Sequence, residues 1–267
     1  MVARMFVLEV KGAQAPVVCL HGFCQSSAYW APTLDRVAEV GRSGIAPDLP
    51  GFAGSADERG PYTMEVFADR VAQLLDDRDI QATAMVGGSM GGVVAQHFAL
   101  RHPSRLTRLL LVATGAYTGD PPAALAKADT FASSTWDDDA VAPIVAGFFR
   151  EAPLAERRAE LIGIARRASQ AAAVEAARSN ARSRTLERLS AISVPTLIVQ
   201  GRYDRARTPE HGAEMRDRIE GAGLVILEES GHSPQLEQPD DFHDIALPFL
   251  LGTPPTSSPP AIERSLA

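Results

Sequence analysis

A short turn rich in glycine is the feature that most restricts how this chain can fold. The run Gly87-Gly88-Ser89-Met90-Gly91-Gly92 follows an apolar stretch, Ala84 to Val86, and precedes a helical pattern that ends before Pro103. Glycines two positions either side of a serine remove the side chains that would collide where a strand and a helix pack closely. We therefore expect a strand, a sharp turn with a strained backbone and a helix, with the hydroxyl of Ser89 at the amino end of that helix.

Short apolar runs alternate with amphipathic helical patterns over most of the chain. Helices are predicted to begin near Thr63, Ser89 and Pro239. This alternation indicates the α/β class, with a mostly parallel twisted sheet flanked by helices. The predicted strands are Met5 to Val10, Val17 to Leu20, Gly44 to Pro47, Ala84 to Val86, Leu106 to Ala113, Thr196 to Gln200 and Leu224 to Leu227.

One long region interrupts the alternation. Residues 117–189 contain no convincing strand, only helix-forming stretches rich in Ala, Arg and Glu and punctuated by prolines. An insertion of this length between two strands is typical of a helical cap. We therefore divide the chain into a core domain of residues 1–116 and 190–251, a cap of residues 117–189, and a flexible tail of residues 252–267.

Composition excludes several classes of function. The net charge of -7 disfavours a nucleic-acid partner. No run of 18 apolar residues and no leader pattern is found, so we expect a cytoplasmic protein without a membrane partner. The two cysteines, Cys19 and Cys24, cannot supply a zinc site or a plausible disulfide. The glycine turn lacks the nucleotide-binding patterns, so no nucleotide is expected to bind there, and no metal site is predicted. The abundance of arginine over lysine suggests a GC-rich bacterial genome.

A serine hydroxyl needs a base to remove its proton and an acid to orient that base. Because Ser89 follows a strand, its partners should lie in loops after later strands. Asp204 follows the strand that ends at Gln200, and His232 follows the strand that ends at Leu227. The competing acids are Glu228, Glu229 and Asp120, of which Asp120 stands where the predicted cap begins. We therefore predict Ser89, Asp204 and His232 as the catalytic residues.

A third motif, His21-Gly22-Phe23, follows the strand that ends at Leu20. Its glycine allows a tight loop that can aim a backbone amide toward the serine. We assign the oxyanion hole to the backbone amides of Phe23 and Met90. His21 is interpreted as a structural residue that braces this loop.

Together these motifs resemble the α/β-hydrolase superfamily, in which the nucleophile, acid and histidine follow in this order along the chain. The resemblance covers about 210 residues, and within the superfamily it is greatest to bacterial carboxylesterases, enol-lactone hydrolases and meta-cleavage-product carbon-carbon hydrolases. It implies the α/β-hydrolase fold, with an eight-stranded, mostly parallel sheet, a helical cap after the sixth strand, and a cofactor-free Ser-His-Asp mechanism. One departure is that only one clear strand precedes Val17. The resemblance rests on His21-Gly22-Phe23, Asp48 to Ser55, Gly87 to Gly92, Gly201 to Asp204 and Gly231 to Pro239.

The function predicted from these motifs is hydrolysis of a carboxylic ester or lactone of a small, apolar substrate through an acyl-enzyme. The alternatives are carbon-carbon bond hydrolysis, acyl transfer, and a ligand receptor on the same scaffold. Most bulky cap residues are expected to form the cap's own core, and its arginines a solvated face. Whether one of these arginines binds a carboxylate of the substrate stays open. The oligomeric state also stays open, with a homodimer as one option.

Overall fold

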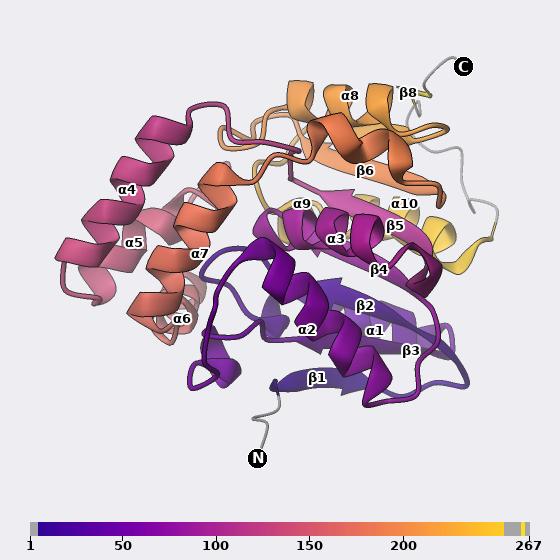
Figure 1. The fold of residues 1–267 in the computed structure, drawn as a ribbon, viewed down its shortest axis with the longest axis horizontal. Coiled ribbons are helices and arrows are strands. Elements are labelled where there is room, and N and C mark those ends of the chain that lie inside the picture. Colours follow the sequence, from indigo (N-terminus) through magenta and orange to yellow (C-terminus); the bar gives the residue numbers. More distant parts are fainter. Residues whose placement is uncertain (1–4, 254–262, 265–267) are drawn as a thin grey trace.

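A twisted sheet runs through the centre of the computed structural model, which describes residues 5–253 and 263–264 (Figure 1). Its strand order is β1-β3-β2-β4-β5-β6-β7-β8. Strands β2 to β7 are all parallel to one another, whereas β1 and β8 pair antiparallel at the two edges. The bounds are β1 Val7–Val10, β2 Gln14–Leu20, β3 Arg42–Pro47, β4 Thr83–Gly88, β5 Leu106–Val112, β6 Thr196–Gly201, β7 Gly223–Leu227 and β8 Glu263–Arg264.

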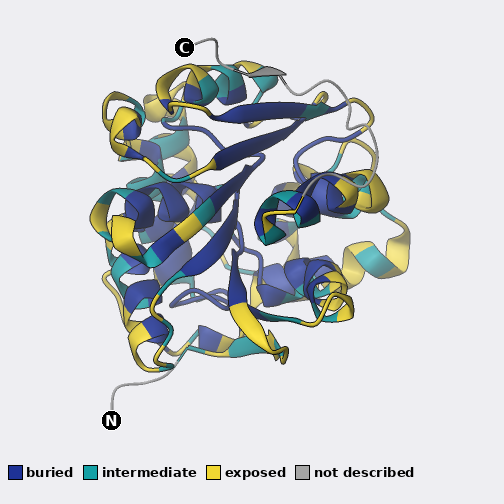
Figure 2. Ribbon diagram, turned by 90° about the vertical axis from the view of Figure 1, so that its right-hand side faces the viewer, coloured by how far each residue is buried: buried dark blue, intermediate teal, exposed yellow. Residues whose placement is uncertain are grey.

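Helices cover both faces of the sheet, as Figure 2 shows with the sheet turned toward its edge. Helices α1 (Ala31–Glu39) and α10 (Pro239–Leu251) pack on one face, and α2 (Met64–Asp76), α3 (Met90–Arg101) and α8 (Pro209–Arg218) on the other. Short helices complete the core: η1 Ser27–Trp30, η2 Ala53–Ser55, η3 Pro103–Arg105 and α9 Pro234–Glu237.

Alternate residues of each strand supply these two cores, because side chains of a strand point to opposite faces. Val18 and Leu20 of β2 join the cluster under α2 and α3, whereas Val17 and Cys19 join the cluster under α1 and α10. Strands buried on both faces read as continuous apolar runs. This burial explains why the strands could be located from the sequence.

The helical insertion lies between β5 and β6 and projects from one end of the sheet (Figure 1). Its entering and leaving segments lie side by side, where the Thr185 N–H donates to the Ala116 carbonyl at 2.8 Å. The fold class is as expected, but the insertion follows the fifth strand of this chain and not the sixth. The count differs because only β1 precedes β2. The insertion consists of α4 Pro121–Ser133, α5 Asp138–Ala146, α6 Ala155–Arg166, α7 Gln170–Arg182 and η4 Leu186–Ala191.

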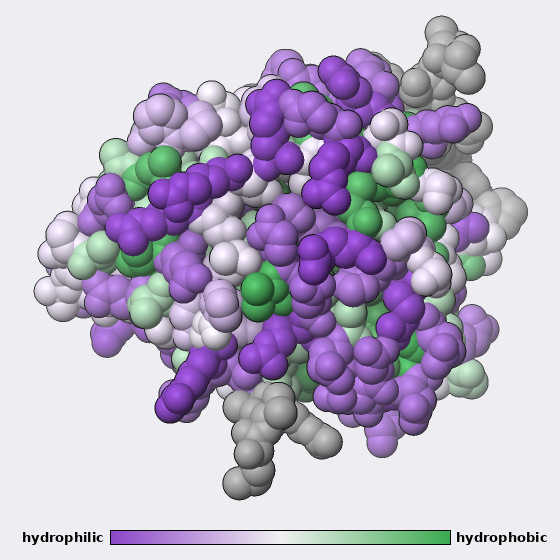
Figure 3. Space-filling view, in the orientation of Figure 1, coloured by the Kyte–Doolittle hydropathy of each residue, from purple (hydrophilic) through white to green (hydrophobic). Residues whose placement is uncertain are grey.

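Most of the predicted tail lies outside the described residues, which leave out 254–262 and 265–267. Helix α10 ends at Leu251, where Gly252 takes a left-handed conformation with φ of 73°. Over the described part of the chain, no helix combines the length and the apolar character that crossing a membrane requires. Figure 3 shows polar side chains over most of one face of the molecule, with small separate apolar areas.

Candidate active site

Ser89 lies at the sharp turn between β4 and α3, with φ of 50° and ψ of -117°. This conformation is rare for a residue with a side chain, and it is held from both sides. The Ser89 N–H donates to the Val112 carbonyl at 2.9 Å, and the Thr114 hydroxyl donates to the Ser89 carbonyl at 2.7 Å. The strained turn predicted from the glycine pattern is therefore present and fixed by the neighbouring strand.

The glycines of this turn are required by close backbone approaches. A Cβ on Gly87 would lie 2.7 Å from the Gly92 Cα, and one on Gly91 would lie 2.6 Å from the His21 carbonyl oxygen. Real Cβ atoms do not approach backbone atoms this closely. Helix α3 can therefore pack against β4 and the loop after β2 only because these positions lack side chains.

The three side chains predicted to act together lie in one hydrogen-bonded line. The Nε2 atom of His232 is 2.8 Å from the Ser89 hydroxyl oxygen, and its Nδ1 atom is 2.7 Å from Asp204 Oδ2. They come from loops after β4, β6 and β7, which end at the same edge of the sheet. Neither Glu228, paired with Arg202, nor Asp120, which caps α4, occupies the position of Asp204.

The carboxylate of Asp204 is held by its own loop. Its Oδ1 atom accepts the backbone N–H groups of Ala206 at 2.8 Å and Arg207 at 2.9 Å, leaving Oδ2 for His232. Asp204 and His232 are buried, whereas Ser89 is half-buried. A buried acid that accepts several N–H groups stays in one orientation, so it can fix the ring of His232.

The loop after β2 lies against the serine, because a Cβ on Gly22 would be 3.2 Å from the Ser89 Cβ. The Gln25 side chain accepts the Gly22 N–H at 2.8 Å, and the Gln25 N–H donates back to the Gly22 carbonyl at 3.2 Å. This turn places Cys24 at φ of 53°. Within the described residues, the N–H groups of Phe23 and Met90 have no loop, turn or side-chain acceptor. Both are therefore free to donate to a bound oxygen.

His21 braces this loop, as expected. Its Nε2 accepts the Leu49 N–H at 2.8 Å, so its Nδ1 carries the proton and donates to the Gly22 carbonyl at 2.8 Å. Burial of the ring lowers its pKa below the ordinary value, against an opposing effect of Asp48. Both ring nitrogens are occupied within the fold, which leaves His21 a structural role.

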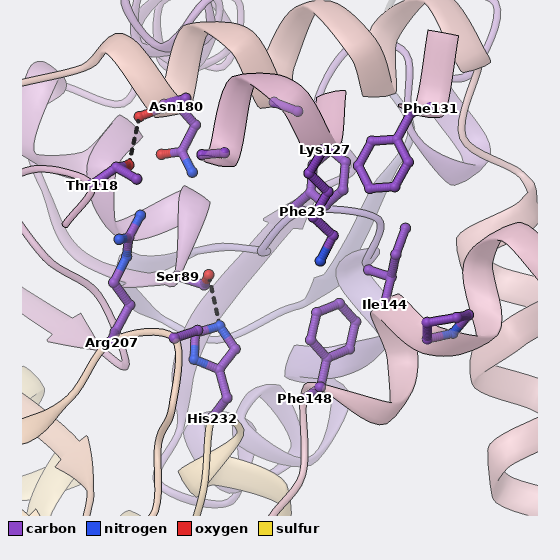
Figure 4. Close-up of a pocket in the computed structure, with 16 residues that line it drawn as sticks. Phe23, Ser89, Thr118, Lys127, Phe131, Ile144, Phe148, Asn180, Arg207 and His232 are labelled. Carbon is purple, nitrogen blue, oxygen red and sulfur yellow. Dashed lines mark hydrogen bonds between the residues drawn. The ribbon is translucent and has the colours of Figure 1, made fainter. Parts of the chain in front are cut away.

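A cavity of about 290 Å³ lies between the sheet edge and the helical insertion, with Ser89 and His232 in its wall (Figure 4). Of the bulky residues in the insertion, Phe131, Ile144 and Phe148 line this cavity, whereas Val145 is buried away from it. The interpretation of these residues as an internal core is therefore correct only in part. The remaining lining is Phe23, Thr118, Ala124, Lys127, Pro143, Gly147, Ala177, Asn180, Ala181, Ala206 and Arg207.

The sequence pattern does not single out the cationic residues that line the cavity. None of the arginines that cluster in the insertion lines it, and four of them form exposed ion pairs with acids at positions 160, 138, 129 and 187. Instead the cavity receives Lys127 from α4 and Arg207 from the loop after β6. The available signals were weak: Lys127 is one of only two lysines, and Arg207 follows Asp204 by three positions.

Glu237 also has a role in the site that its motif alone did not reveal. Its Oε2 atom accepts the N–H groups on both sides of His232, from Gly231 at 2.9 Å and from Ser233 at 3.0 Å. This carboxylate therefore fixes the backbone that carries the histidine.

As for metal binding, the described residues include no cluster of three or more His, Cys, Asp or Glu side chains suited to an ion.

Known proteins resemble this chain in sequence and in structure. It is 31% identical over 217 residues to a pimeloyl-[acyl-carrier protein] methyl ester esterase of Neisseria meningitidis serogroup A, covering 78% of this chain and 68% of the relative. It is 28% identical over 260 residues to a 2-hydroxy-6-oxo-2,4-heptadienoate hydrolase of Pseudomonas putida, covering 90% of each. The enol-lactonase from Burkholderia xenovorans LB400 superposes with a TM-score of 0.83 at 25% identity, covering 92% of this chain and 96% of that one.

A sequence model of a whole protein family also matches this chain. The sequence model of the Alpha/beta hydrolase family matches residues 17–245, which include the loops after β2, β4, β6 and β7. The chain therefore belongs to the alpha/beta hydrolase family.

Proposed function

We propose that this protein is a serine hydrolase that cleaves a carboxylic ester or a lactone of a small substrate. The observation that carries the proposal is the hydrogen-bonded line from Ser89 through His232 to Asp204 at the wall of a cavity. The named esterase and enol-lactonase among its relatives support the same reaction class.

The first half of the proposed reaction forms an acyl-enzyme. His232 takes the proton of the Ser89 hydroxyl as its oxygen attacks the substrate carbonyl, and Asp204 stabilises the imidazolium that results. The amides of Phe23 and Met90 donate to the developing oxyanion, where the N-terminus of α3 adds a favourable field. His232 then gives its proton to the leaving alcohol oxygen.

The second half regenerates the serine. Water takes the position of the alcohol and attacks the acyl carbon as His232 removes its proton. The tetrahedral intermediate then collapses, the bond to the Ser89 oxygen breaks, His232 returns the proton to that oxygen, and the acid is released. Phe148 stacks on His232 with 6.2 Å between ring centroids, so the ring has an apolar surface on one side. This contact supports a fixed ring orientation through both halves.

The decisive experiment is to replace Ser89 by alanine. Wild type should hydrolyse members of a panel of p-nitrophenyl esters and lactones and should gain the mass of one phosphonyl group on Ser89 after treatment with a fluorophosphonate. Ser89→Ala should lose both properties and keep its circular dichroism spectrum, whereas Ser104→Ala, at an exposed site, should keep both. Turnover that persists in Ser89→Ala would refute the proposal.

Carbon-carbon bond hydrolysis is a second candidate, because the 2-hydroxy-6-oxo-2,4-heptadienoate hydrolase matches over 90% of both chains. The test measures two rates with the same purified protein. One is the bleaching of a chromogenic ring-cleavage product, and the other is the hydrolysis of an aryl ester. A faster bleaching reaction would favour this second candidate over the ester or lactone hydrolase.

A further inference from the structure

The charges that line the cavity are all of one sign. Among the described residues that form its wall are Lys127 and Arg207 but no aspartate or glutamate, in a chain whose net charge is -7. Around the candidate nucleophile the molecule therefore presents a positive surface that its overall composition does not favour. Complementarity of charge makes such a cavity suited to an anionic ligand.

Arg207 is the more unusual of the two cations because it is buried, with only 9% of its surface exposed. Its backbone N–H donates to Asp204, and its side chain extends beside Ser89 and His232 toward Asn180 (Figure 4). Its guanidinium donates one hydrogen bond, to the Tyr117 carbonyl at 3.2 Å. The carboxylate of Asp204 stabilises its charge from a distance, but no acidic side chain among the described residues accepts a hydrogen bond from the guanidinium, which carries five N–H donors.

A buried guanidinium with unused donors is costly to the fold unless a ligand uses them. Burial lowers the pKa of Arg207 from its ordinary value, yet a guanidinium stays charged at neutral pH. Asn180 of α7 lies on the same side of the cavity, and its buried side-chain oxygen has no partner among the described residues, so it can accept a hydrogen bond from a hydroxyl or N–H of a ligand but does not bind an anion. The donors available to an anion on this side of the cavity are therefore those of Arg207.

Lys127 differs from Arg207 in its environment. It is exposed, it lies on the other side of Ser89 in Figure 4, and its ammonium is 6.0 Å from the centre of the Phe131 ring. An exposed ammonium is already hydrated, so it gains little from pairing with an anion. The stronger anion site is therefore the one at Arg207.

We propose that the substrate of this site carries a carboxylate and that Arg207 binds it beside the scissile carbonyl. The inference rests on the proposed function, because it specifies which esters or lactones the cavity accepts. A carboxylate matches the planar donor face of a guanidinium in two parallel hydrogen bonds. The matching substrate class is the half-ester of a dicarboxylic acid or a lactone that bears a free carboxylate.

The kinetic test compares charged and neutral substrates of equal chain length. Methyl half-esters of succinic, glutaric, adipic and pimelic acid are assayed in a pH-stat against methyl butanoate, pentanoate, hexanoate and heptanoate. Wild type should prefer the charged member of at least one pair in kcat/KM. Arg207→Met should reduce that preference about 10- to 100-fold, as expected for loss of a charge-assisted hydrogen bond, and Arg207→Lys should restore part of it.

Controls separate ligand binding from damage to the fold. Arg205→Met removes an exposed charge from the same loop and should leave the preference and the rate unchanged. Disturbance of Asp204 in Arg207→Met would slow charged and neutral substrates alike, so the ratio of the two reports on the carboxylate alone. Three results would overturn the assignment. Wild type could show no preference for charged over neutral substrates, the preference could persist in Arg207→Met, or it could disappear in Lys127→Met and not in Arg207→Met.

A binding measurement keeps this inference distinct from the proposed function. Ser89→Ala cannot form an acyl-enzyme, so calorimetric titration with the preferred half-ester reports on binding alone. Binding that is present in Ser89→Ala and lost in Ser89→Ala/Arg207→Met supports the carboxylate site. If wild type turns over no ester and this loss of binding is still seen, only the hydrolase proposal is refuted. Turnover without any Arg207-dependent preference or binding would refute the carboxylate site and leave the hydrolase proposal standing.

Discussion

Glu237 links the histidine loop to the helical insertion, because its Oε1 atom accepts the backbone N–H of Arg150 at 2.6 Å. Arg150 stands between α5 and α6, and the other oxygen of Glu237 accepts the N–H groups on both sides of His232. One carboxylate therefore positions both the candidate base and the segment of the insertion that lies over it.

Glu237→Gln should weaken this link, because an amide presents a donor where one carboxylate oxygen accepted. We expect a loss of about 1.5–3 kcal/mol in the free energy of unfolding, and kcat lowered about 10-fold with a smaller change in KM. Urea unfolding and steady-state kinetics measure both effects. Glu220→Gln, at an exposed site, serves as the control, and equal kcat values in the two variants would contradict the positioning role.

Asp204→Asn tests the acid of the proposed mechanism. An asparagine keeps the size of the side chain but favours the wrong tautomer of His232, so kcat should fall on the order of 10³ to 10⁴, with KM within a few fold. Glu228→Gln removes the nearby exposed acid that pairs with Arg202 and should leave kcat within two-fold of wild type. The same kinetic assay applied to both variants decides which carboxylate acts.

Ser89, Asp204 and His232 could be brought together from the sequence because each follows a strand of one parallel sheet. Parallel strands end at a shared edge, so residues separated by 143 positions become neighbours once the strands are located. The assignment of the oxyanion hole to the amides of Phe23 and Met90 rests on the same reasoning and stays a prediction. Their positions depend on backbone topology, which local apolar runs and glycines indicate well.

Arg207, Lys127 and Glu237 could not be assigned in this way. Their contributions depend on which way a side chain turns and on how the insertion packs over the sheet edge. Helical periodicity does not determine these details, and α6, for example, shows no clear apolar face. The arginines of the insertion were the more visible charges in the sequence, yet the cavity is lined by cations from elsewhere.

Two glycines of this chain should respond to alanine in opposite ways. Gly91→Ala would place a Cβ against the carbonyl oxygens of Leu20 and His21, so it should destabilise the fold by several kcal/mol or shift the serine turn. Gly163 lies exposed within α6 with open space around it, so Gly163→Ala should stabilise the protein by about 0.5–1 kcal/mol. Urea unfolding of the pair checks the prediction, which is contradicted if both variants change stability in the same direction.

Stability should fall on mild acidification because several histidines are held neutral by burial. The pKa values of His21, His97, His211 and His243 are all lowered in the folded state, with burial as the largest cause. Below about pH 6.5 the unfolded chain therefore binds more protons than the folded one, and the free energy of unfolding decreases as pH falls.

Each such histidine should contribute a slope of up to about 1.4 kcal/mol per pH unit. His243 is suited to a test, since it is buried and its Nε2 lies 3.0 Å from the Thr33 hydroxyl. Urea unfolding of wild type and His243→Gln at pH 7.5, 6.5 and 5.5 should show a shallower decline in the variant. Parallel declines in the two proteins would show that His243 does not contribute.

Phe131, together with Lys127, Pro143 and Ile144, lines both the cavity at Ser89 and a second cavity of about 630 Å³ at α4 and α5. Its ring lines both and stacks on Phe23, with 5.9 Å between centroids. Phe131→Ala should join the two spaces, raising kcat/KM for long acyl chains relative to short ones, at a cost in stability of about 3–5 kcal/mol. A series of p-nitrophenyl esters of increasing chain length measures the shift.

Val145→Ala is the matched control, because Val145 is fully buried in α5 but does not line either cavity. It should lower stability through the lost packing and leave the order of chain-length preference as in wild type. A shift of the same size in Val145→Ala would mean that general loosening of the insertion, and not removal of the Phe131 ring, admits the longer chains. The contrast between the two variants therefore tests whether one aromatic ring sets the length of the substrate.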